Sequence, residues 1–580
     1  MLRDVFGAWI DAATEREFDA PLLALLASQG FSDIHLLHGA FEFGKDAVAK
    51  RGWMDPGGPS AVSPLPGLHQ WALQSKAGDI GLGDWREIRH QLDEARLDDL
   101  AHPSFDLALP RVGVLVLTGR LKGGAAVQAQ SYRESERRRG RPDLQVWDRE
   151  TLLDWLVDSP GSAIAGMAEG PLLGLLASVD AGTLEALGIE RYARRWLPDH
   201  DDEYPNDAAG KTPLLRAAVE ASVIGTRLRG AGRCDLAALV ALALLRAVHA
   251  APVPAAEPRR AALGMFAGYA GLLLDAVEPL AADPRALLGA TVGVPLAHVP
   301  YMVVCQRLVE TLGLLGLLGL TEPDLPRLPS PQRVTKVVAD LAAHQPGVGH
   351  LAGDAFAVSL LAPVVLLARE QPVAARALVV RATVWLADRH DPQLAGNGLA
   401  PVEATADEVV RQLLSGPLED GPTRRTGSYA ATVLIDLAAL LQHLRPAAAP
   451  TLYGDVLNDT LASGACPELV LPDGARRTWR PDDRRRRLLP LVRYTEPLPA
   501  DGAAADHHHQ AVDPGLRAWD VLAMSSVTRD RHDVVNLVAL ATAPPAAKTL
   551  ILTDQARCRS ALLLTAARGA EQGLGPPTGR

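Results

Sequence analysis

The segment Arg111–Thr118, which reads RVGVLVLT, constrains the fold of this chain more than any other. Its apolar residues are continuous rather than alternating, which is typical of a β-strand buried on both faces. Such a strand belongs inside a sheet that helices cover on both sides. We therefore expect an α/β domain around this segment.

The residues on either side of this strand supply the other elements of the domain. Apolar residues at helical spacing predict four helices, at Glu15–Gln29, Trp85–Leu97, Ala125–Arg138 and Glu150–Val157. Short extended segments bounded by turn residues predict four further strands, at Asp33–His38, Lys45–Lys50, Gln70–Lys76 and Asp143–Trp147. The expected order is helix, three strands, helix, strand, helix, strand, helix, in a first domain of residues 1–160.

The composition and the apolar periodicity of the chain change after residue 160. Segments rich in Ala and Leu have helical periodicity, and aromatic residues make up only 4% of the chain, which favours helix over sheet. We expect an all-α sensor or scaffold region at residues 161–450 and a mixed, mostly helical C-terminal region at 451–580. The fold class is thus an α/β N-terminal domain followed by a large, mostly α-helical region.

Composition excludes several classes of protein. The net charge is −10, from 58 basic and 68 acidic residues, which excludes a globally basic, histone-like binder. The four cysteines lie far apart without a CxxC pair, which argues against a disulfide framework and a cysteine zinc site. The longest apolar runs, Ala261–Leu274 and Ala355–Leu367, are shorter than the roughly 18 residues that span a membrane. We expect a soluble, cytoplasmic protein with no membrane partner.

Three polar residues on two neighbouring strands are the candidate catalytic group. Asp46 lies on the strand at 45–50, and Gln74 and Lys76 share one face of the strand at 70–76, because alternate residues of a strand point the same way. If the two strands form a hairpin, a carboxylate, an amide oxygen and an ammonium meet at one end of the sheet. Asp46 and Gln74 are then candidate ligands for Mg²⁺ or Mn²⁺. Lys76 is suited to orienting a water molecule and holding developing negative charge.

A helix acid completes this group. Glu15 and Asp19 are four residues apart on the preceding helix and so share a helix face. Asp19 lies beside the apolar stripe that faces the sheet, and we prefer it as the further ligand or water-holding residue. Glu15 is the alternate.

A small cluster of arginines lies in the same domain. Residues 1–160 contain 18 basic and 24 acidic residues, a net charge of −6, so phosphate binding there needs a metal, a partner or a second subunit to overcome repulsion. The candidate phosphate contacts are Arg137, Arg138, Arg139 and Arg141.

The ordered series of helix acid, strand Asp and QxK resembles the PD-(D/E)xK nuclease superfamily, and most closely its Mrr-like restriction endonuclease branch, in which QxK replaces (D/E)xK. The matching segments are EFDAPLLALLASQGF (Glu17–Phe31), GKD (Gly44–Asp46), QSK (Gln74–Lys76) and LQVWDRETLLDWL (Leu144–Leu156). The resemblance covers roughly the first quarter of the chain. It implies a restriction-endonuclease-like fold and metal-dependent cleavage of DNA, with Asp46, Gln74 and Lys76 as the active-site triad.

This resemblance leads to an expected role for the whole protein. We expect a Mg²⁺-dependent endonuclease, acting on DNA as a restriction or anti-phage defence effector. The helical region would bind a regulatory protein or a small-molecule trigger, and a homodimer would match the symmetry of duplex DNA. The alternative is a catalytically inactive nuclease-fold module that serves as a nucleic-acid or protein-binding scaffold. A nuclease acting on RNA is a third, weaker candidate.

Overall fold

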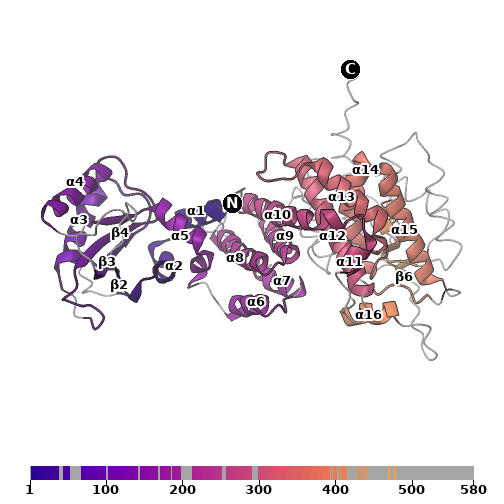
Figure 1. Ribbon diagram of the computed structural model, residues 1–580, viewed down its shortest axis with the longest axis horizontal. Helices are drawn as coiled ribbons and strands as arrows, with labels where there is room; N and C mark the ends of the chain where they lie inside the picture. Colours follow the sequence, from indigo (N-terminus) through magenta and orange to yellow (C-terminus); the bar gives the residue numbers. More distant parts are fainter. Residues whose placement is uncertain are drawn as a thin grey trace, which may run out of the picture. The chain divides into compact units, whose positions relative to one another are not determined.

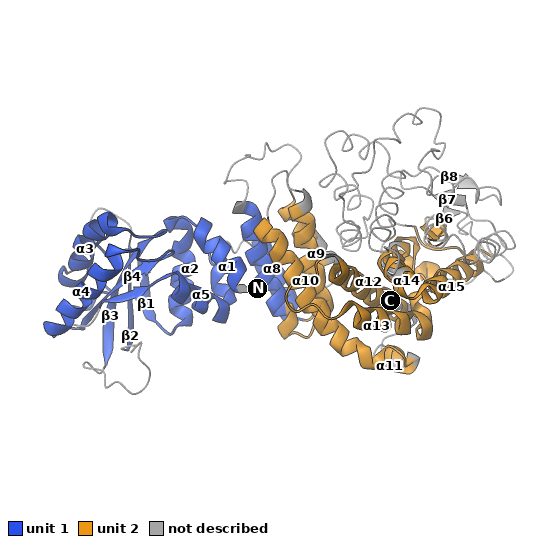
Figure 2. Cartoon of the chain, turned by 90° about the horizontal axis from the view of Figure 1, so that it is seen from above, with its two compact units in different colours: residues 1–181, 205–227 blue, residues 182–204, 228–580 orange. Residues whose placement is uncertain are grey.

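The computed structural model describes residues 2–37, 44–52, 67–99, 102–140, 144–166, 170–184, 186–197, 212–250, 256–289 and 298–391, parts of 394–441, and two short strands at 468–470 and 476–478. The chain forms two compact units (Figure 2). The first comprises residues 1–181 and 205–227, and the second comprises residues 182–204 and 228–580. The first unit therefore extends beyond the expected boundary at residue 160.

The first unit contains all the elements that the sequence predicts. They are α2 (Glu15–Ser28), β1 (Ser32–Leu36), β2 (Ala47–Gly52), β3 (Leu68–Lys76), α3 (Leu82–Leu97), β4 (Arg111–Leu117), α4 (Gly124–Arg138), β5 (Gln145–Trp147) and α5 (Arg149–Asp158). One additional helix, α1 (Leu2–Ala12), precedes them, and α6 (Gly170–Asp180) and the first part of α8 (Thr212–Gly230) follow. The expected α/β order is confirmed.

The five strands form one mixed sheet in the order β1-β2-β3-β4-β5. β1, β2 and β3 pair antiparallel, whereas β3, β4 and β5 pair parallel. In β4, every residue after Arg111 is buried, which confirms the expectation of a strand covered on both faces. Lys76 at the end of β3 pairs with Leu117 at the end of β4, so these strands end at the same edge of the sheet.

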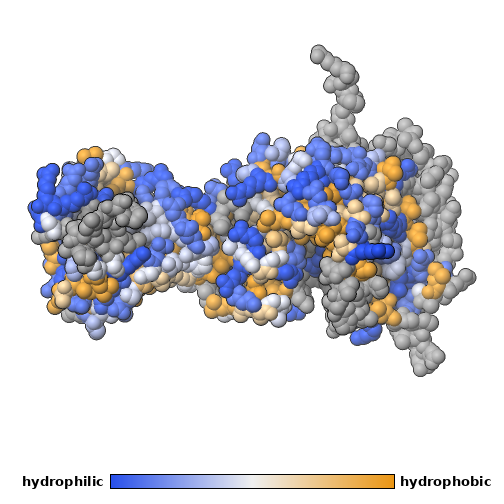
Figure 3. All heavy atoms as spheres, viewed as in Figure 1, coloured by the Kyte–Doolittle hydropathy of each residue, from blue (hydrophilic) through white to orange (hydrophobic). Residues whose placement is uncertain are grey.

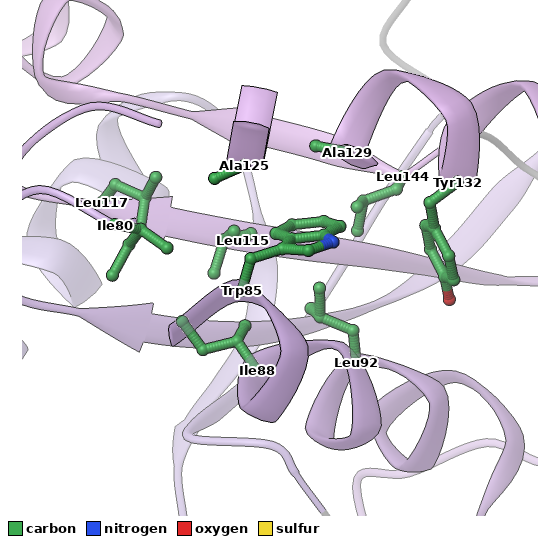
Figure 4. Packing of buried hydrophobic residues seen from close by; sticks show 10 residues of the cluster. All are labelled: Ile80, Trp85, Ile88, Leu92, Leu115, Leu117, Ala125, Ala129, Tyr132 and Leu144. Atoms are coloured by element: carbon green, nitrogen blue, oxygen red, sulfur yellow. The ribbon is translucent and has the colours of Figure 1, made fainter. Parts of the chain in front are cut away.

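Helices cover both faces of this sheet (Figure 1). On one face, α3 and α4 enclose a cluster in which Trp85 packs against Leu115 of β4 (Figure 4). On the other face, Trp71 of β3 contacts Phe31 and Trp147, with ring centroids 5.3 and 6.0 Å apart. These two apolar layers fix the sheet, and with it the edge at which β3 and β4 end.

The described part of the second unit is mostly helical, as expected. Its α-helices are α7 (Ala186–Ala193), α9 (Cys234–Ala250), α10 (Ala256–Val277), α11 (Pro284–Gly289), α12 (His298–Thr321), α13 (Pro331–His344), α14 (Leu361–Glu370), α15 (Pro372–His390) and α16 (Ala406–Leu414). A small sheet joins β6 (Gly427–Ser428), β7 (Glu468–Val470) and β8 (Arg476–Thr478). Apart from β7 and β8, the expected C-terminal region at 451–580 lies outside the described residues.

Two helical stretches in the described residues are long and apolar enough to cross a membrane by composition alone. They are Ala256–Leu280 and Tyr301–Leu320. About half of the most apolar 18 residues of the first stretch and about two-thirds of those of the second are buried inside the protein. Core helices of soluble proteins have the same properties. The sequence analysis considered part of the first stretch, as an apolar run too short to span a membrane. In the second stretch, Gln306, Arg307 and Glu310 interrupt the apolar run without ending the helix.

Candidate functional site

Asp46 is fixed at the entrance to β2 by its backbone. Its N–H donates to the Leu73 carbonyl at 2.8 Å, and its own carbonyl accepts from the Leu37 N–H at 2.8 Å. Two residues earlier, Gly44 has φ +66°, and a Cβ atom there would lie 2.1 Å from the Gln91 carbonyl oxygen of α3. Only glycine fits this position, so the GKD sequence follows from how closely the chain approaches α3.

The hairpin that the sequence predicts between the Asp46 and Gln74 segments is confirmed. Ala47 pairs with Leu73 in an antiparallel register, which places Asp46 opposite Gln74. The Gln74 Nε2 donates to Asp46 Oδ2 at 2.7 Å, and the Ser75 backbone N–H donates to the same oxygen at 2.6 Å. Two donors therefore hold the carboxylate in one orientation at the end of the sheet.

Gln74 is only 3% exposed, and its Oε1 is buried with no hydrogen-bond partner. A buried acceptor without a donor carries a desolvation cost of roughly 1–3 kcal/mol, which a cation would offset. The Asp46 carboxylate and this amide oxygen are oxygen ligands of the kind that Mg²⁺ prefers, and Mg²⁺ commonly keeps several waters beside one or two carboxylates. The residues present therefore fit the expected ion.

Lys76 contacts the acid that was expected as the alternate. Its Nζ lies 3.1 Å from Glu15 Oε1 in the first turn of α2, and both side chains are partly exposed. Asp19 lies one turn further along α2 and is half-buried. The structure thus brings Asp46 and Gln74 together, and it brings Glu15 within hydrogen-bonding distance of the Lys76 ammonium.

The first turn of α2 is braced on both sides of Glu15. Thr14 and Glu17 form a capping box, in which the Thr14 N–H donates to Glu17 Oε2 at 3.0 Å. Arg216 of α8 forms an ion pair with the same carboxylate. The Thr14 backbone hydrogen bond is the main cause that lowers the pKa of Glu17, and Arg216 adds to it. Glu15 therefore projects from a helix end that is held in place.

Lys45 lies next to Asp46 in sequence but does not belong to the site. Its side chain is fully buried, and its Nζ donates to the Glu94 carbonyl of α3 at 3.3 Å. The pKa of Lys45 is lowered to about 8, mainly by burial and in smaller part by the charge of Arg111. This lysine is part of the packing against α3.

The arginine cluster at the end of α4 is remote from Asp46. Glu136 pairs with Arg96 in the last turn of α3, and Arg96 packs against Gly113 near the start of β4, whereas the site lies where β4 ends. The 15 residues of α4 separate the two edges by about 22 Å. Figure 3 shows a hydrophilic surface over α4. Arg137, Arg138 and Arg139 are exposed there, and Arg141 lies outside the described residues.

The metal-binding potential of the site rests on few ligands. Among the residues that the structure describes, no group of three or more His, Cys, Asp and Glu side chains is placed to hold a metal ion. One carboxylate, one amide oxygen and the nearby Glu15 make up the candidate set. No family model, no curated protein and no solved structure matches this chain.

Proposed function

We propose that the N-terminal unit has a restriction-endonuclease-like fold of the Mrr-like branch and is a Mg²⁺-dependent endonuclease acting on DNA. The observation that carries this proposal is the contact between Asp46 and Gln74 at the sheet edge, with the QxK lysine two residues further along the same strand. The contact between the Glu15 carboxylate of α2 and the Lys76 ammonium supports the same proposal. These groups share one edge although they come from α2, β2 and β3.

The side chains divide the chemistry of phosphodiester hydrolysis between them. Asp46, held by Gln74 and the Ser75 N–H, is oriented to bind a divalent cation together with the Gln74 amide oxygen. A bound Mg²⁺ supplies charge stabilisation and lowers the pKa of its water. The Lys76 ammonium is suited to orienting the attacking water and to neutralising charge that develops on the phosphate. Glu15 fixes the position of that ammonium through their 3.1 Å contact.

The helical unit suggests how such an enzyme is controlled. A nuclease inside a cell must be restrained, and a large helical region attached to a small catalytic unit is suited to binding a regulatory protein or a small-molecule trigger. We place the protein among cytoplasmic restriction or anti-phage effectors on this fold-level analogy.

The test is a cleavage assay with the full chain on plasmid and linear DNA, with Mg²⁺ or Mn²⁺ and with EDTA. Asp46→Ala and Lys76→Ala are compared with Lys50→Ala, a lysine of β2 that pairs with Asp33 instead. We expect metal-dependent cutting by the wild type and by Lys50→Ala, and loss of cutting in the other two variants.

Other outcomes assign the protein to the alternative functions. If the wild type and every variant bind DNA but none cuts it, in Mg²⁺ or in Mn²⁺, the nuclease proposal is contradicted. That result favours an inactive nucleic-acid-binding module. Cutting of RNA but not of DNA favours the RNA-directed enzyme.

A further inference from the structure

The two loops that leave β3 and β4 form one surface directly beyond Lys76. Ile80 in the loop at 77–81 bridges to Leu121 in the loop at 118–123. Gly119 approaches so closely that a Cβ atom there would lie 2.3 Å from the backbone of Gly78. The position of both loops is therefore set by the parallel pairing of β3 and β4, and both begin at the edge that carries the candidate site.

This surface carries two cations and one acid. Arg120 and Lys122 are 58% and 67% exposed, and Asp79 is the acidic residue of the two loops. Lys122 Nζ lies 2.5 Å from Asp79 Oδ2, and Arg120 forms an ion pair with Glu150 of α5. Exposed ion pairs of this kind contribute little to stability, so a phosphate group can replace the carboxylates at small cost.

We propose that Arg120 and Lys122 bind the phosphodiester backbone of the nucleic acid beside the phosphate that is cut at Asp46 and Lys76. This inference rests on the proposed nuclease function and names the substrate contacts of the same site. A strand that enters the site must pass the edge of the sheet where β3 and β4 end, and these are the exposed cations of the two loops at that edge. Backbone contacts position the duplex without reading its sequence.

The arginine cluster of α4 provides a matched control, because it lies at the edge of the sheet opposite to Asp46 and so is not placed beside the phosphate that is cut, contrary to the expectation from the sequence. The double variant Arg120→Ala/Lys122→Ala removes two exposed cations at the site edge, and Arg137→Ala/Arg138→Ala removes two exposed cations at the opposite edge. Binding of the full-length protein to a fluorescent DNA duplex is measured by anisotropy in EDTA, over a series of NaCl concentrations, so that no cleavage occurs. Cleavage by the wild type with Mg²⁺ is measured in parallel.

We expect the salt dependence of DNA binding to change in one of the two double variants only. Each lost phosphate contact reduces the slope of log K against log[salt] by about 0.9, so Arg120→Ala/Lys122→Ala reduces it by about 1.8 and the control pair leaves it unchanged. Equal slopes for the two double variants, together with cleavage by the wild type, overturn this inference but not the proposed nuclease function. Absence of both binding and cleavage in the wild type overturns both. The same loss of slope on an RNA duplex alone supports the cation surface and overturns DNA as the substrate.

Discussion

Replacing Gln74 by Glu tests metal binding without any need for catalysis. In the wild type, Gln74 Nε2 donates to Asp46 Oδ2 at 2.7 Å, and Gln74 is only 3% exposed. Gln74→Glu removes this donor and places a second carboxylate against the first one. Two like charges about 4 Å apart at an effective dielectric constant near 20 repel by roughly 4 kcal/mol. Uptake of a shared proton relieves part of this repulsion, so we expect a loss of about 3–4 kcal/mol at pH 8 in EDTA.

A divalent cation between the two carboxylates reverses this loss. Binding to the folded state alone stabilises by RT ln(1 + [L]/Kd), which is about 2.7 kcal/mol at a concentration of one hundred times Kd. The assay is urea unfolding of the full chain, followed by tryptophan fluorescence, in EDTA and in 10-fold steps of Mg²⁺. We expect the stability of Gln74→Glu to rise with Mg²⁺ more steeply than that of the wild type.

Gln70→Glu is the matched control for this substitution. Gln70 is fully buried on the same strand and the same strand face, but its amide bonds to the Ala49 carbonyl and the Asp106 N–H, away from Asp46. We expect Gln70→Glu to be destabilised equally in EDTA and in Mg²⁺. A Mg²⁺ response that is the same for both variants would refute the assignment of the metal to Asp46 and Gln74.

Three further predictions concern the N-terminal unit that carries the site. Glu136→Met removes the carboxylate that lies 2.8 Å from the buried guanidinium of Arg96, and it should lower the free energy of unfolding in urea by about 3–5 kcal/mol. The double variant Arg96→Met/Glu136→Met should recover most of this loss; equal losses for the single and double variants would contradict the pairing. The pKa of Lys45 is lowered to about 8, so this lysine binds a proton less readily in the folded state than in the unfolded state. The free energy of unfolding should therefore rise by up to about 3 kcal/mol between pH 8 and 10.5, and Lys45→Met should abolish that rise. An unchanged pH dependence in the variant would show that the rise has another cause. Glu15→Gln should slow cleavage about 10- to 100-fold, because it weakens the contact that holds the Lys76 ammonium, and Asp19→Asn should slow cleavage less. A larger effect of Asp19→Asn than of Glu15→Gln would make Asp19 the helix acid.

The period-2 alternation of strands explains why the core of the site could be predicted. Asp46 and Gln74 lie on short segments bounded by turn signals, and a hairpin register is enough to bring them together. The same reasoning preferred Asp19 to Glu15, because Asp19 lies beside the apolar stripe of the helix, although both acids occupy one helix face. The choice depends on where the long side chain of Lys76 reaches once β3 has ended, and the sequence pattern does not contain that direction.

The basic residues show the limit of sequence reasoning more clearly. Arg137, Arg138 and Arg139 are adjacent in sequence and so attract attention, yet α4 carries them to the far edge of the sheet. Arg120 and Lys122 stand apart in a glycine-containing loop, and only the parallel pairing of β3 with β4 brings them beside Lys76. That pairing depends on the packing of α3 and α4 against the sheet, which no local pattern encodes.

Iron-directed cleavage of the protein backbone tests the position of the metal most directly. Fe²⁺ replaces Mg²⁺ in the full chain, ascorbate and peroxide are added, and hydroxyl radicals formed at the bound ion cut the nearby backbone, with the fragments identified by mass spectrometry. The proposed site predicts cuts within 44–47 and 73–76 that Mg²⁺ suppresses and that Asp46→Ala abolishes. Cuts confined to other segments, or the same cuts in Asp46→Ala, would contradict a metal ion held by Asp46 and Gln74.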